Sequence, residues 1–301
     1  MVKIKPINKI TSAGIVLIVF VFLSAFIQPA SGATGQPDVP GVNTQRISLK
    51  PQAAGSDLTE ASLSDGSEPM DGTGGQMGLF NSYPASEVRQ MMAQSSDRKI
   101  VFLTFDDGPS NDNTVEILRI LKENGVAATF FYVTRGDMEN YKDVIWETYL
   151  NGNSIGIHTN THDYEELYPG RYADPEAILA DVQTAIGKIR SILGNDWDTN
   201  VYRFPGGSFS WKGINPAIQI LSQHGLEYVD WNTMTGDSDQ ANHDKSSEGL
   251  VRFLMDSNDE LNSGVHVVLM HDGSWIEGVV GSLQEIIDYY KFMDYEFAVI
   301  K

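Results

Sequence analysis

The segment Ile100-Val-Phe-Leu-Thr-Phe-Asp-Asp-Gly-Pro109 joins a run of apolar residues to two adjacent carboxylates. A short apolar run rich in β-branched and aromatic residues, ended by a Gly-Pro turn, predicts a buried strand. Farther along the chain, the run Ser154–His158 leads in the same way into His158-Thr-Asn-Thr-His162. Acidic and imidazole side chains at the ends of separate buried strands indicate a site that is assembled by the fold.

Further runs of this kind bring the number of predicted strands to seven: Ile100–Phe105, Ala128–Val133, Ser154–His158, Val201–Phe204, Tyr228–Asn232, Val265–Met270 and Glu296–Ile300. Helical patterns lie between most of them, which favours a parallel sheet covered by helices. An open doubly wound sheet fits this count as well. Because six strands carry polar clusters at their carboxyl ends, we predict an irregular (β/α) barrel of about seven parallel strands, similar to a TIM barrel.

Two of the predicted helices have recognisable ends. Asn113 stands in an N-cap position with Glu116 three residues later, and Gly125 follows the last apolar residue of that helix. A second helix is predicted to begin at Asp174-Pro175 and to end at Gly194. Helices at these places would connect consecutive parallel strands on the outside of the barrel.

Residues 1–33 have the pattern of an export signal. Lysines at positions 3, 5 and 9 precede the apolar stretch Ala13–Ile27, and small residues follow at positions 30–33. This order is typical of a secretory signal peptide. The alternative is an uncleaved membrane anchor, because the apolar stretch is only slightly shorter than the ~17–25 residues that span a bilayer. In both cases we expect the rest of the chain to be extracellular, secreted or anchored at the outer face of the cell membrane.

Composition divides the remaining chain into two parts. Residues 34–96 are rich in Gly, Ser, Asp, Pro and Thr, which is typical of a linker, with a short helix expected around Ala85 to Gln94. Residues 97–301 form the predicted folded domain and hold 33 acidic and 15 basic residues, a net charge of −18. Such a surface repels phosphate backbones, so we do not expect a nucleic-acid partner. We also expect the chain to be a monomer.

The chain contains no cysteine, which excludes Cys-ligated zinc, iron–sulfur clusters and a thiol nucleophile. Any metal site must therefore use imidazole and carboxylate ligands. Asp107, His158 and His162 offer one carboxylate oxygen and two imidazoles, a set that suits Zn²⁺, Co²⁺ or Ni²⁺. A His-x-x-x-His pair by itself also occurs on helix surfaces, but here it follows a predicted strand and is accompanied by the separate Asp pair.

The residues that remain can supply acid–base chemistry. Asp106, the spare carboxylate, is the candidate general base for a water activated by the metal. His271, at the end of an apolar strand, is the candidate general acid for a leaving amine. Arg203 could hold Asp106 by a bidentate pair, and Asp237 could orient His271 and raise its pKa, the alternative for both being a surface charge. The backbone N–H of Gly206 could approach a developing oxyanion.

Together these segments resemble the polysaccharide deacetylase family, carbohydrate esterase family 4. Thr104-Phe-Asp-Asp-Gly-Pro109 is similar to the first motif of that family, in which the leading Asp is the base and the second Asp is a metal ligand. His158-Thr-Asn-Thr-His162 resembles its metal-binding motif. Arg203-Phe-Pro-Gly-Gly207 resembles the segment that steadies the base, and Leu269-Met-His271 resembles the segment that supplies the acid. The resemblance covers residues 97–301 and implies a metal-dependent deacetylase domain.

One motif departs from the family pattern. The usual D-S-x-D-W is replaced by Met234-Thr-Gly-Asp237-Ser238 after Trp231, so that only the second Asp is kept and the aromatic wall of the acetyl pocket is missing. A narrower resemblance, to Gram-positive wall deacetylases with Asp-Trp-Asn before Gly-Asp, accommodates this loss. We expect the substrate to contact Gly206, Trp231 and Leu269. In place of the missing aromatic residue, Trp211 or Trp275 would supply the face on which a sugar ring stacks.

The resemblance implies an enzyme that removes N-acetyl groups from N-acetylglucosamine-type residues of an extracellular glycan. We expect peptidoglycan as the substrate and chitooligosaccharide as the next choice. An acetylxylan O-deacetylase would use the same residues with an alcohol leaving group. An inactive glycan-binding module is an alternative from another functional class.

Overall fold

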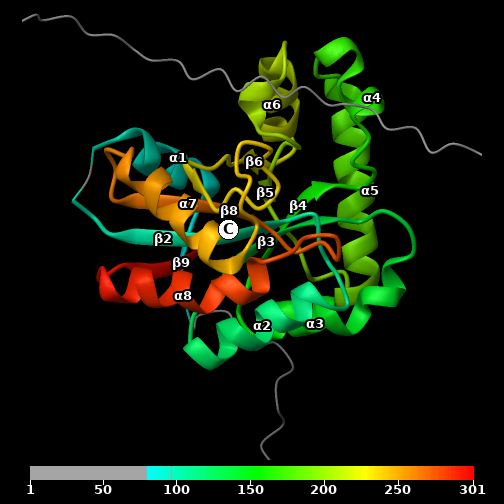
Figure 1. Ribbon diagram of the computed structural model, residues 1–301. Helices are drawn as coiled ribbons and strands as arrows, with labels where there is room; N and C mark the ends of the chain where they lie inside the picture. The colour runs from blue at the N-terminus through cyan, green and yellow to red at the C-terminus, as the bar shows by residue number, and fades with distance from the viewer. Residues whose placement is uncertain (1–79, 96) are drawn as a thin grey trace, which may run out of the picture. The chain divides into compact units, whose positions relative to one another are not determined.

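The computed structural model describes residues 80–95 and 97–301, and seven parallel strands form its curled central sheet (Figure 1). The strands pair in the order β7-β8-β2-β3-β4-β5-β6. Their bounds are β2 (Ile100–Asp106), β3 (Thr129–Val133), β4 (Ser154–Thr159), β5 (Val201–Tyr202), β6 (Glu227–Tyr228), β7 (Thr233–Met234) and β8 (Val265–His271). The predicted irregular (β/α) barrel is confirmed.

The predicted strand Tyr228–Asn232 is wrong in detail, because the structure has two short strands, β6 and β7, on either side of residues 229–232. The side chains of Asp230 and Asn232, both in this stretch, form hydrogen bonds to other segments. Asp230 accepts hydrogen bonds from the backbone and the hydroxyl of Ser208. The amide of Asn232 bonds to the backbones of Val265 and Val267. The chain therefore crosses from one edge of the curled sheet to the other within four residues, 229–232.

The predicted strand Glu296–Ile300 exists as β9, but it lies outside the seven-strand order. It pairs with β1 (Asn81–Tyr83) and with only the first two residues of β2, Ile100 and Val101. The amino-terminal end of β2 thus has β9 beside it, and the carboxyl-terminal end has β3. The seventh strand of the barrel is β7, which is too short to be recognised from its sequence.

Side-chain alternation along β2 determines which groups face the barrel interior. Alternate residues from Val101 to Phe105 pack in the larger hydrophobic cluster, together with residues of the outer helices. Ile100 and Phe102 belong to a smaller cluster formed by the opposite faces of several strands. Because successive residues of a strand point to opposite faces, Asp106 shares the inner face with Ile100 and Phe102. The interior is therefore apolar at the amino ends of the strands and polar at their carboxyl ends.

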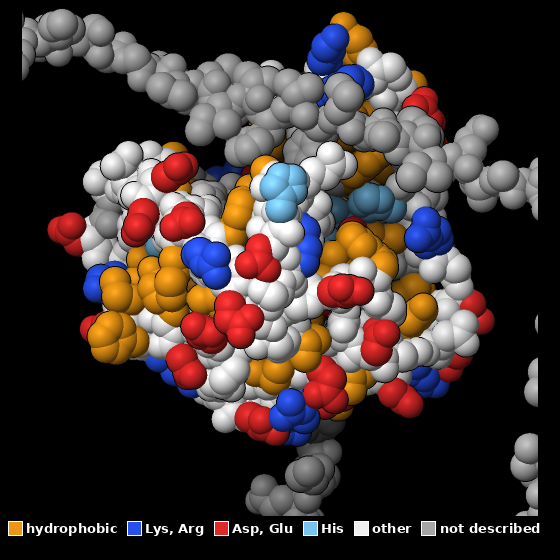
Figure 2. Space-filling view, in the orientation of Figure 1, with side chains coloured by type: hydrophobic (Ala, Val, Ile, Leu, Met, Phe, Trp, Pro, Cys, Tyr) orange, Lys and Arg blue, Asp and Glu red, His pale blue; other side chains and the backbone are white. Residues whose placement is uncertain are grey.

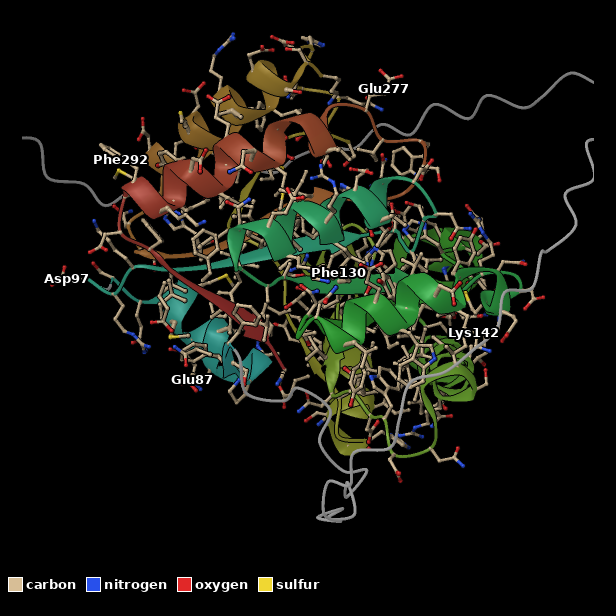
Figure 3. The ribbon with its side chains drawn as sticks, turned by 90° about the horizontal axis from the view of Figure 1, so that it is seen from below. Glu87, Asp97, Phe130, Lys142, Glu277 and Phe292 are labelled. Carbon is tan, nitrogen blue, oxygen red and sulfur yellow. The ribbon has the colours of Figure 1, made fainter. Side chains whose placement is uncertain are left out.

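Helices cover the outside of the sheet, and Figure 3 shows α2, α3 and α8 running across it with Phe130 beneath them. Asp174 caps α5 through the N–H groups of Glu176 and Ala177, and Gly194 ends it, as predicted. The described helices are α1 (Ala85–Ala93), α2 (Asn113–Asn124), α3 (Lys142–Leu150), α4 (Tyr164–Leu167), α5 (Pro175–Leu193), α6 (Ile214–Gln223), α7 (Ser247–Asp259) and α8 (Val279–Phe292).

The predicted cap of α2 is wrong by one residue. Asp112 is the N-cap, and its carboxylate accepts the N–H of Asn113. The Asn113 amide donates instead to the carbonyls of Gly273 and Ile276. An N-cap side chain turns back to its own helix, so Asn113 could not cap the helix and tie it to the segment after β8 as well. Gly125, with φ of 64°, ends α2 as predicted.

The folded part of the chain includes residues that composition places in the linker. The short helix expected around Ala85 to Gln94 is present as α1, and it packs against β6 and β8. Ala85 and Val88 of this helix are buried in the smaller hydrophobic cluster. Arg89 donates to the carbonyl of Tyr228 and pairs with Glu227. Helix α1 therefore covers the edge of the sheet where β6 ends the strand order.

The signal peptide or anchor predicted in residues 1–33 lies outside the described residues. Within residues 80–95 and 97–301, every helix is too short or too polar to cross a bilayer.

Gly156 offers a test of interior packing. It lies on the inner face of β4, where an added Cβ would be 2.9 Å from the Phe131 ring and 3.2 Å from the Val201 carbonyl oxygen. We predict that Gly156→Ala lowers the free energy of unfolding by about 1–3 kcal/mol, measured by urea denaturation, because the ring must move. Gly187→Ala, in an exposed part of α5 with no neighbour within 4 Å, should raise it by about 0.5–1 kcal/mol. An equal response of both variants would contradict this packing.

Candidate active site

Asp106 and His271 lie opposite each other at the carboxyl ends of two neighbouring strands. Asp106 is the last residue of β2, and its register partner on β8 is His271, the last residue of that strand. Both side chains are buried, and both follow the inner face of their strands. Asp107 comes next with a φ of 73°, a left-handed conformation that is uncommon outside glycine. The chain thus turns abruptly at the point where the two carboxylates stand.

The structure brings Asp107, His158 and His162 together. The Oδ1 atom of Asp107 lies 3.6 Å from Nε2 of His158 and 3.4 Å from Nε2 of His162. One ligand atom from each residue lies within 4.8 Å of the others. His158 comes from β4, whereas His162 follows in a loop with a φ of 53°. Two of the three side chains therefore depend on left-handed backbone at a functional site, as strained conformations often do.

The three side chains fit a tetrahedral cation. Ligand atoms about 2.0–2.1 Å from Zn²⁺ are about 3.3 Å apart at tetrahedral angles, close to the observed separations. Oδ1 of Asp107 is buried and has no hydrogen-bond partner among the described residues. Nδ1 of His158 donates to the carbonyl of Arg203, which leaves Nε2 turned toward the carboxylates. A buried acceptor without a donor, facing two imidazole nitrogens, is what a metal site requires.

Protonation in this cluster also suits a metal. Burial raises the pKa of the Asp107 carboxyl, but the imidazoles of His158, His271 and His162 outweigh it and hold the pKa below its usual value. Burial, with the neighbouring His158, lowers the pKa of His162 to about 4. Asp107 is therefore ionised and His162 neutral at pH 7, which are the forms that bind metal.

Arg203 fixes the orientation of Asp106. Its fully buried guanidinium donates from Nη1 to Oδ1 of Asp106 at 2.9 Å and to Oγ1 of Thr104 at 2.7 Å. Its other nitrogens donate to the carbonyls of Val229 and Asp230. The bidentate pair that the sequence suggested is therefore wrong, because three other acceptors compete for the same donors. One oxygen of Asp106 is held, and Oδ2 lies 3.9 Å from Nε2 of His158.

Asp237 fixes the orientation of the His271 side chain. Nδ1 of His271 lies 3.1 Å and 3.3 Å from the two carboxylate oxygens of Asp237, which also accepts the backbone N–H of His271 at 2.7 Å. Burial by itself lowers the pKa of His271, but the carboxylates of Asp237, Asp107 and Asp106, Asp237 foremost, raise it to about 9. His271 can thus carry a proton at neutral pH, with Nε2 near the hydroxyl of Ser238 at 3.4 Å.

The remaining predicted residues follow the carboxyl ends of β5 and β6 or lie near the end of β8. Gly206 has a φ of 71°, and a Cβ on it would lie 3.8 Å from the Trp211 ring. The Trp231 ring covers the next residue, Gly207, where a Cβ would lie 3.1 Å away. Leu269 is two residues before His271 and points to the same inner face of β8. No described contact ties Gly206 or Leu269 to the three-residue cluster.

Aromatic rings stand on several sides of the cluster. The Tyr164 ring lies 5.2 Å from the rings of both His162 and Trp211. The Trp275 ring is 6.2 Å from the His271 ring and is 63% exposed. Phe209, also exposed, meets Trp231 edge to face at 5.3 Å. Figure 2 shows histidine side chains in pale blue beside orange hydrophobic side chains on one face of the molecule.

Two buried residues beside the site were not singled out from the sequence. Asp272 is fully buried after His271, and burial raises the pKa of its carboxyl to about 7. Its Oδ2 accepts from Thr114 at 2.5 Å, and a Cβ on Gly108 would lie 2.3 Å from the same atom. Asp181 of α5 lies beneath the loop that carries His162. A carboxylate directly after a buried strand and a carboxylate within the apolar stripe of a helix were the signals.

Comparison with known proteins places this geometry in a family. The model of the polysaccharide deacetylase family matches residues 93–229. YheN of Bacillus subtilis, assigned to the polysaccharide deacetylases, is 31% identical over 226 residues, which cover 74% of this chain and 75% of YheN.

Solved structures agree in fold. A CE4 esterase of Streptococcus mutans is 37% identical with a TM-score of 0.70, covering 73% of this chain and 92% of that protein. The catalytic domain of peptidoglycan N-acetylglucosamine deacetylase from Eubacterium rectale is 29% identical with a TM-score of 0.58, covering 69% and 94%.

Removing one imidazole tests the metal site. We predict that His158→Ala weakens Zn²⁺ binding by more than about 100-fold, measured by isothermal titration calorimetry, because a ligand and its backbone anchor are lost together. His243→Ala, in an exposed loop, serves as the matched control and should bind like the unaltered protein. Full affinity in His158→Ala would rule out His158 as a ligand.

The pairing of Asp237 with His271 makes a second prediction. In the metal-free protein, NMR titration should give His271 a pKa of about 9. Asp237→Asn removes the largest of the charges that oppose burial, so the pKa should fall by about 1 to 3 pH units. An unchanged pKa would show that Asp237 does not govern the protonation of His271.

Proposed function

The chain belongs to the polysaccharide deacetylase family, and from this premise we propose that it hydrolyses the N-acetyl groups of N-acetylglucosamine residues in an extracellular glycan. The observation that carries the proposal is the convergence of Asp107, His158 and His162 within 4.8 Å of one another. Asp106 and His271 flank this cluster on neighbouring strands. A metal site with one carboxylate and one imidazole to spare is suited to amide hydrolysis.

The family is metal-dependent, and we propose Zn²⁺ as the metal, held by Asp107, His158 and His162. Two imidazoles and one carboxylate leave a fourth position open, as in catalytic zinc sites, and Co²⁺ or Ni²⁺ would fit the same donors. When bound, the metal would polarise the acetyl carbonyl and increase the acidity of water.

The residues around the metal divide the proton transfers between them. Asp106, oriented by Arg203, accepts the proton of the attacking water through the oxygen that Arg203 does not hold. His271, protonated because of Asp237, gives its proton to the departing sugar amine. The N–H of Gly206 is the proposed donor to the oxyanion. Trp231 and Leu269 would bound the substrate.

Peptidoglycan is the substrate that we propose. The similar Eubacterium rectale structure is that of a peptidoglycan N-acetylglucosamine deacetylase. Exposed rings at Tyr164, Phe209 and Trp275 offer apolar faces on which sugar rings can stack. The signal or anchor pattern of residues 1–33 would bring a monomeric domain to the outer face of the membrane, next to the wall.

Mass spectrometry of products tests the proposal directly. The purified protein is incubated with N-acetylglucosamine oligomers, muropeptides and acetylxylan, with and without a chelator. We expect loss of acetyl groups from muropeptides, abolished by the chelator. Release from acetylxylan alone would favour the O-deacetylase. Binding to glycans without any release, unchanged by the chelator, would support an inactive module and contradict the proposal.

The variant Asp106→Asn tests the role of the base without removing a proposed metal ligand. We predict that kcat falls by about 10²–10⁴-fold, because the water loses its proton acceptor. Zn²⁺ content, measured by elemental analysis, should remain one ion per chain. The change leaves the buried Arg203 without its counter-charge, so circular dichroism must first verify that the variant is folded. Undiminished turnover in a folded, metal-loaded variant would remove Asp106 as the base.

A further inference from the structure

The loop between the two candidate histidine ligands is anchored by hydrogen bonds to another element. It runs from Thr159 to His162, and its last residue has a left-handed φ of 53°. Within the loop, the hydroxyl of Thr159 accepts the N–H of His162 at 3.0 Å. The backbone N–H groups of Asn160 and Thr161 donate outside the loop. Their acceptor lies on a different element, helix α5.

That acceptor is Asp181, whose side chain is buried in the second turn of α5. Oδ1 accepts the N–H of Asn160 at 2.6 Å, and Oδ2 accepts both the N–H and the hydroxyl of Thr161 at 2.9 Å. A single carboxylate thus takes three hydrogen bonds from the two residues that directly precede His162. Hydrogen bonds to a charged acceptor are roughly twice as strong as neutral ones.

The same face of α5 also holds the neighbouring loop. Lys188, two turns after Asp181, donates to the carbonyls of Thr134 and Gly136 at 2.8 Å and 3.2 Å. The hydroxyl of Thr134 donates to the Asn160 side chain at 3.2 Å, which joins the two loops. The position of His162 is therefore set by the Asp181 carboxylate of α5 and by the loop after β3.

We propose that Asp181 is a positioning residue for the metal site, which it preorganises by fixing the loop that carries His162. This inference rests on the metal site of the proposed function. His162 is a quarter exposed and makes no side-chain hydrogen bond among the described contacts, so its ring is positioned by its backbone and by ring contacts with His158 and Tyr164. Residues that orient metal ligands typically change metal affinity by about 10- to 100-fold when they are replaced.

A purely structural role for Asp181 predicts a different outcome. Asp174 on the same helix also accepts two backbone N–H bonds, from Glu176 and Ala177, but it caps α5 and touches neither ligand. Asp181→Asn and Asp174→Asn are therefore matched variants: the same chemical change, on one helix, with and without a link to His162. A structural role for Asp181 would make Asp181→Asn less stable and leave Zn²⁺ binding unchanged in both variants.

The experiment is a Zn²⁺ titration of the full-length chain and both variants by calorimetry, with Co²⁺ absorption spectra and thermal unfolding measured in parallel. We expect Asp181→Asn to weaken Zn²⁺ binding by about 10- to 100-fold and to alter the Co²⁺ spectrum. Asp174→Asn keeps a side-chain oxygen at the N-cap, so it should retain its stability and bind Zn²⁺ like the unaltered chain. High Zn²⁺ should restore most of the kcat of Asp181→Asn.

Thr161→Val provides a milder variant in case Asp181→Asn does not fold. It keeps the volume of the side chain and removes one of the three hydrogen bonds, so we expect about 3- to 10-fold weaker Zn²⁺ binding. Unchanged affinity in folded Asp181→Asn, or in Thr161→Val if that is the only folded variant, would overturn the proposal. Equal weakening in Asp174→Asn would overturn it as well.

The two proposals fail separately. If Zn²⁺ binding responds as expected and no acetyl group is released from any glycan, the positioning role stands and the proposed function does not. If the unaltered chain deacetylates muropeptides and Asp181→Asn keeps full Zn²⁺ affinity, the function stands and the positioning role does not.

Discussion

The buried guanidinium of Arg203 is the interaction on which the rest of the site depends. Its side chain donates to Asp106 and Thr104 on β2 and to the carbonyls of Val229 and Asp230 after β6. Its own carbonyl anchors His158 on β4. Burying a charge costs several kcal/mol unless it is paired and hydrogen-bonded, so these strand ends must meet around it. The same contacts that satisfy Arg203 orient the base and one metal ligand.

Backbone conformation and further hydrogen bonds complete the site around Arg203. Left-handed backbone at Asp107 and His162 brings side chains from a strand end and a loop to a shared point. Asp237 and Asp181 then act on either side, one on His271 and the other on the loop before His162. A metal would satisfy the orphan oxygen of Asp107 and offset the charge that two adjacent carboxylates concentrate. The same residues thus set the geometry of the site and provide the partners that its buried polar groups need.

The sequence predicted most of this arrangement where strong local patterns exist. Long apolar runs ending in Asp106 and His271 identify β2 and β8, and the carboxyl ends of parallel strands in a barrel must meet. The strands β6 and β7 were missed as separate elements because each has only two residues. The single bond between Arg203 and Asp106 was not predictable, since the competing carbonyls belong to Val229 and Asp230, where the sequence predicted a regular strand. Packing of α1 on the barrel was hidden by the polar linker composition before it.

The proposed site depends on the identity of the metal ligands, and X-ray absorption at the zinc edge of the Zn²⁺-loaded full-length chain measures these ligands. This site predicts a shell of nitrogen and oxygen atoms at about 2.0–2.1 Å, with the outer scattering of two imidazoles, from His158 and His162, and with no sulfur. Loss of one imidazole from the spectrum of His162→Ala would identify that ring as a ligand. A spectrum with water oxygens alone, or without imidazole scattering, would contradict the proposed site.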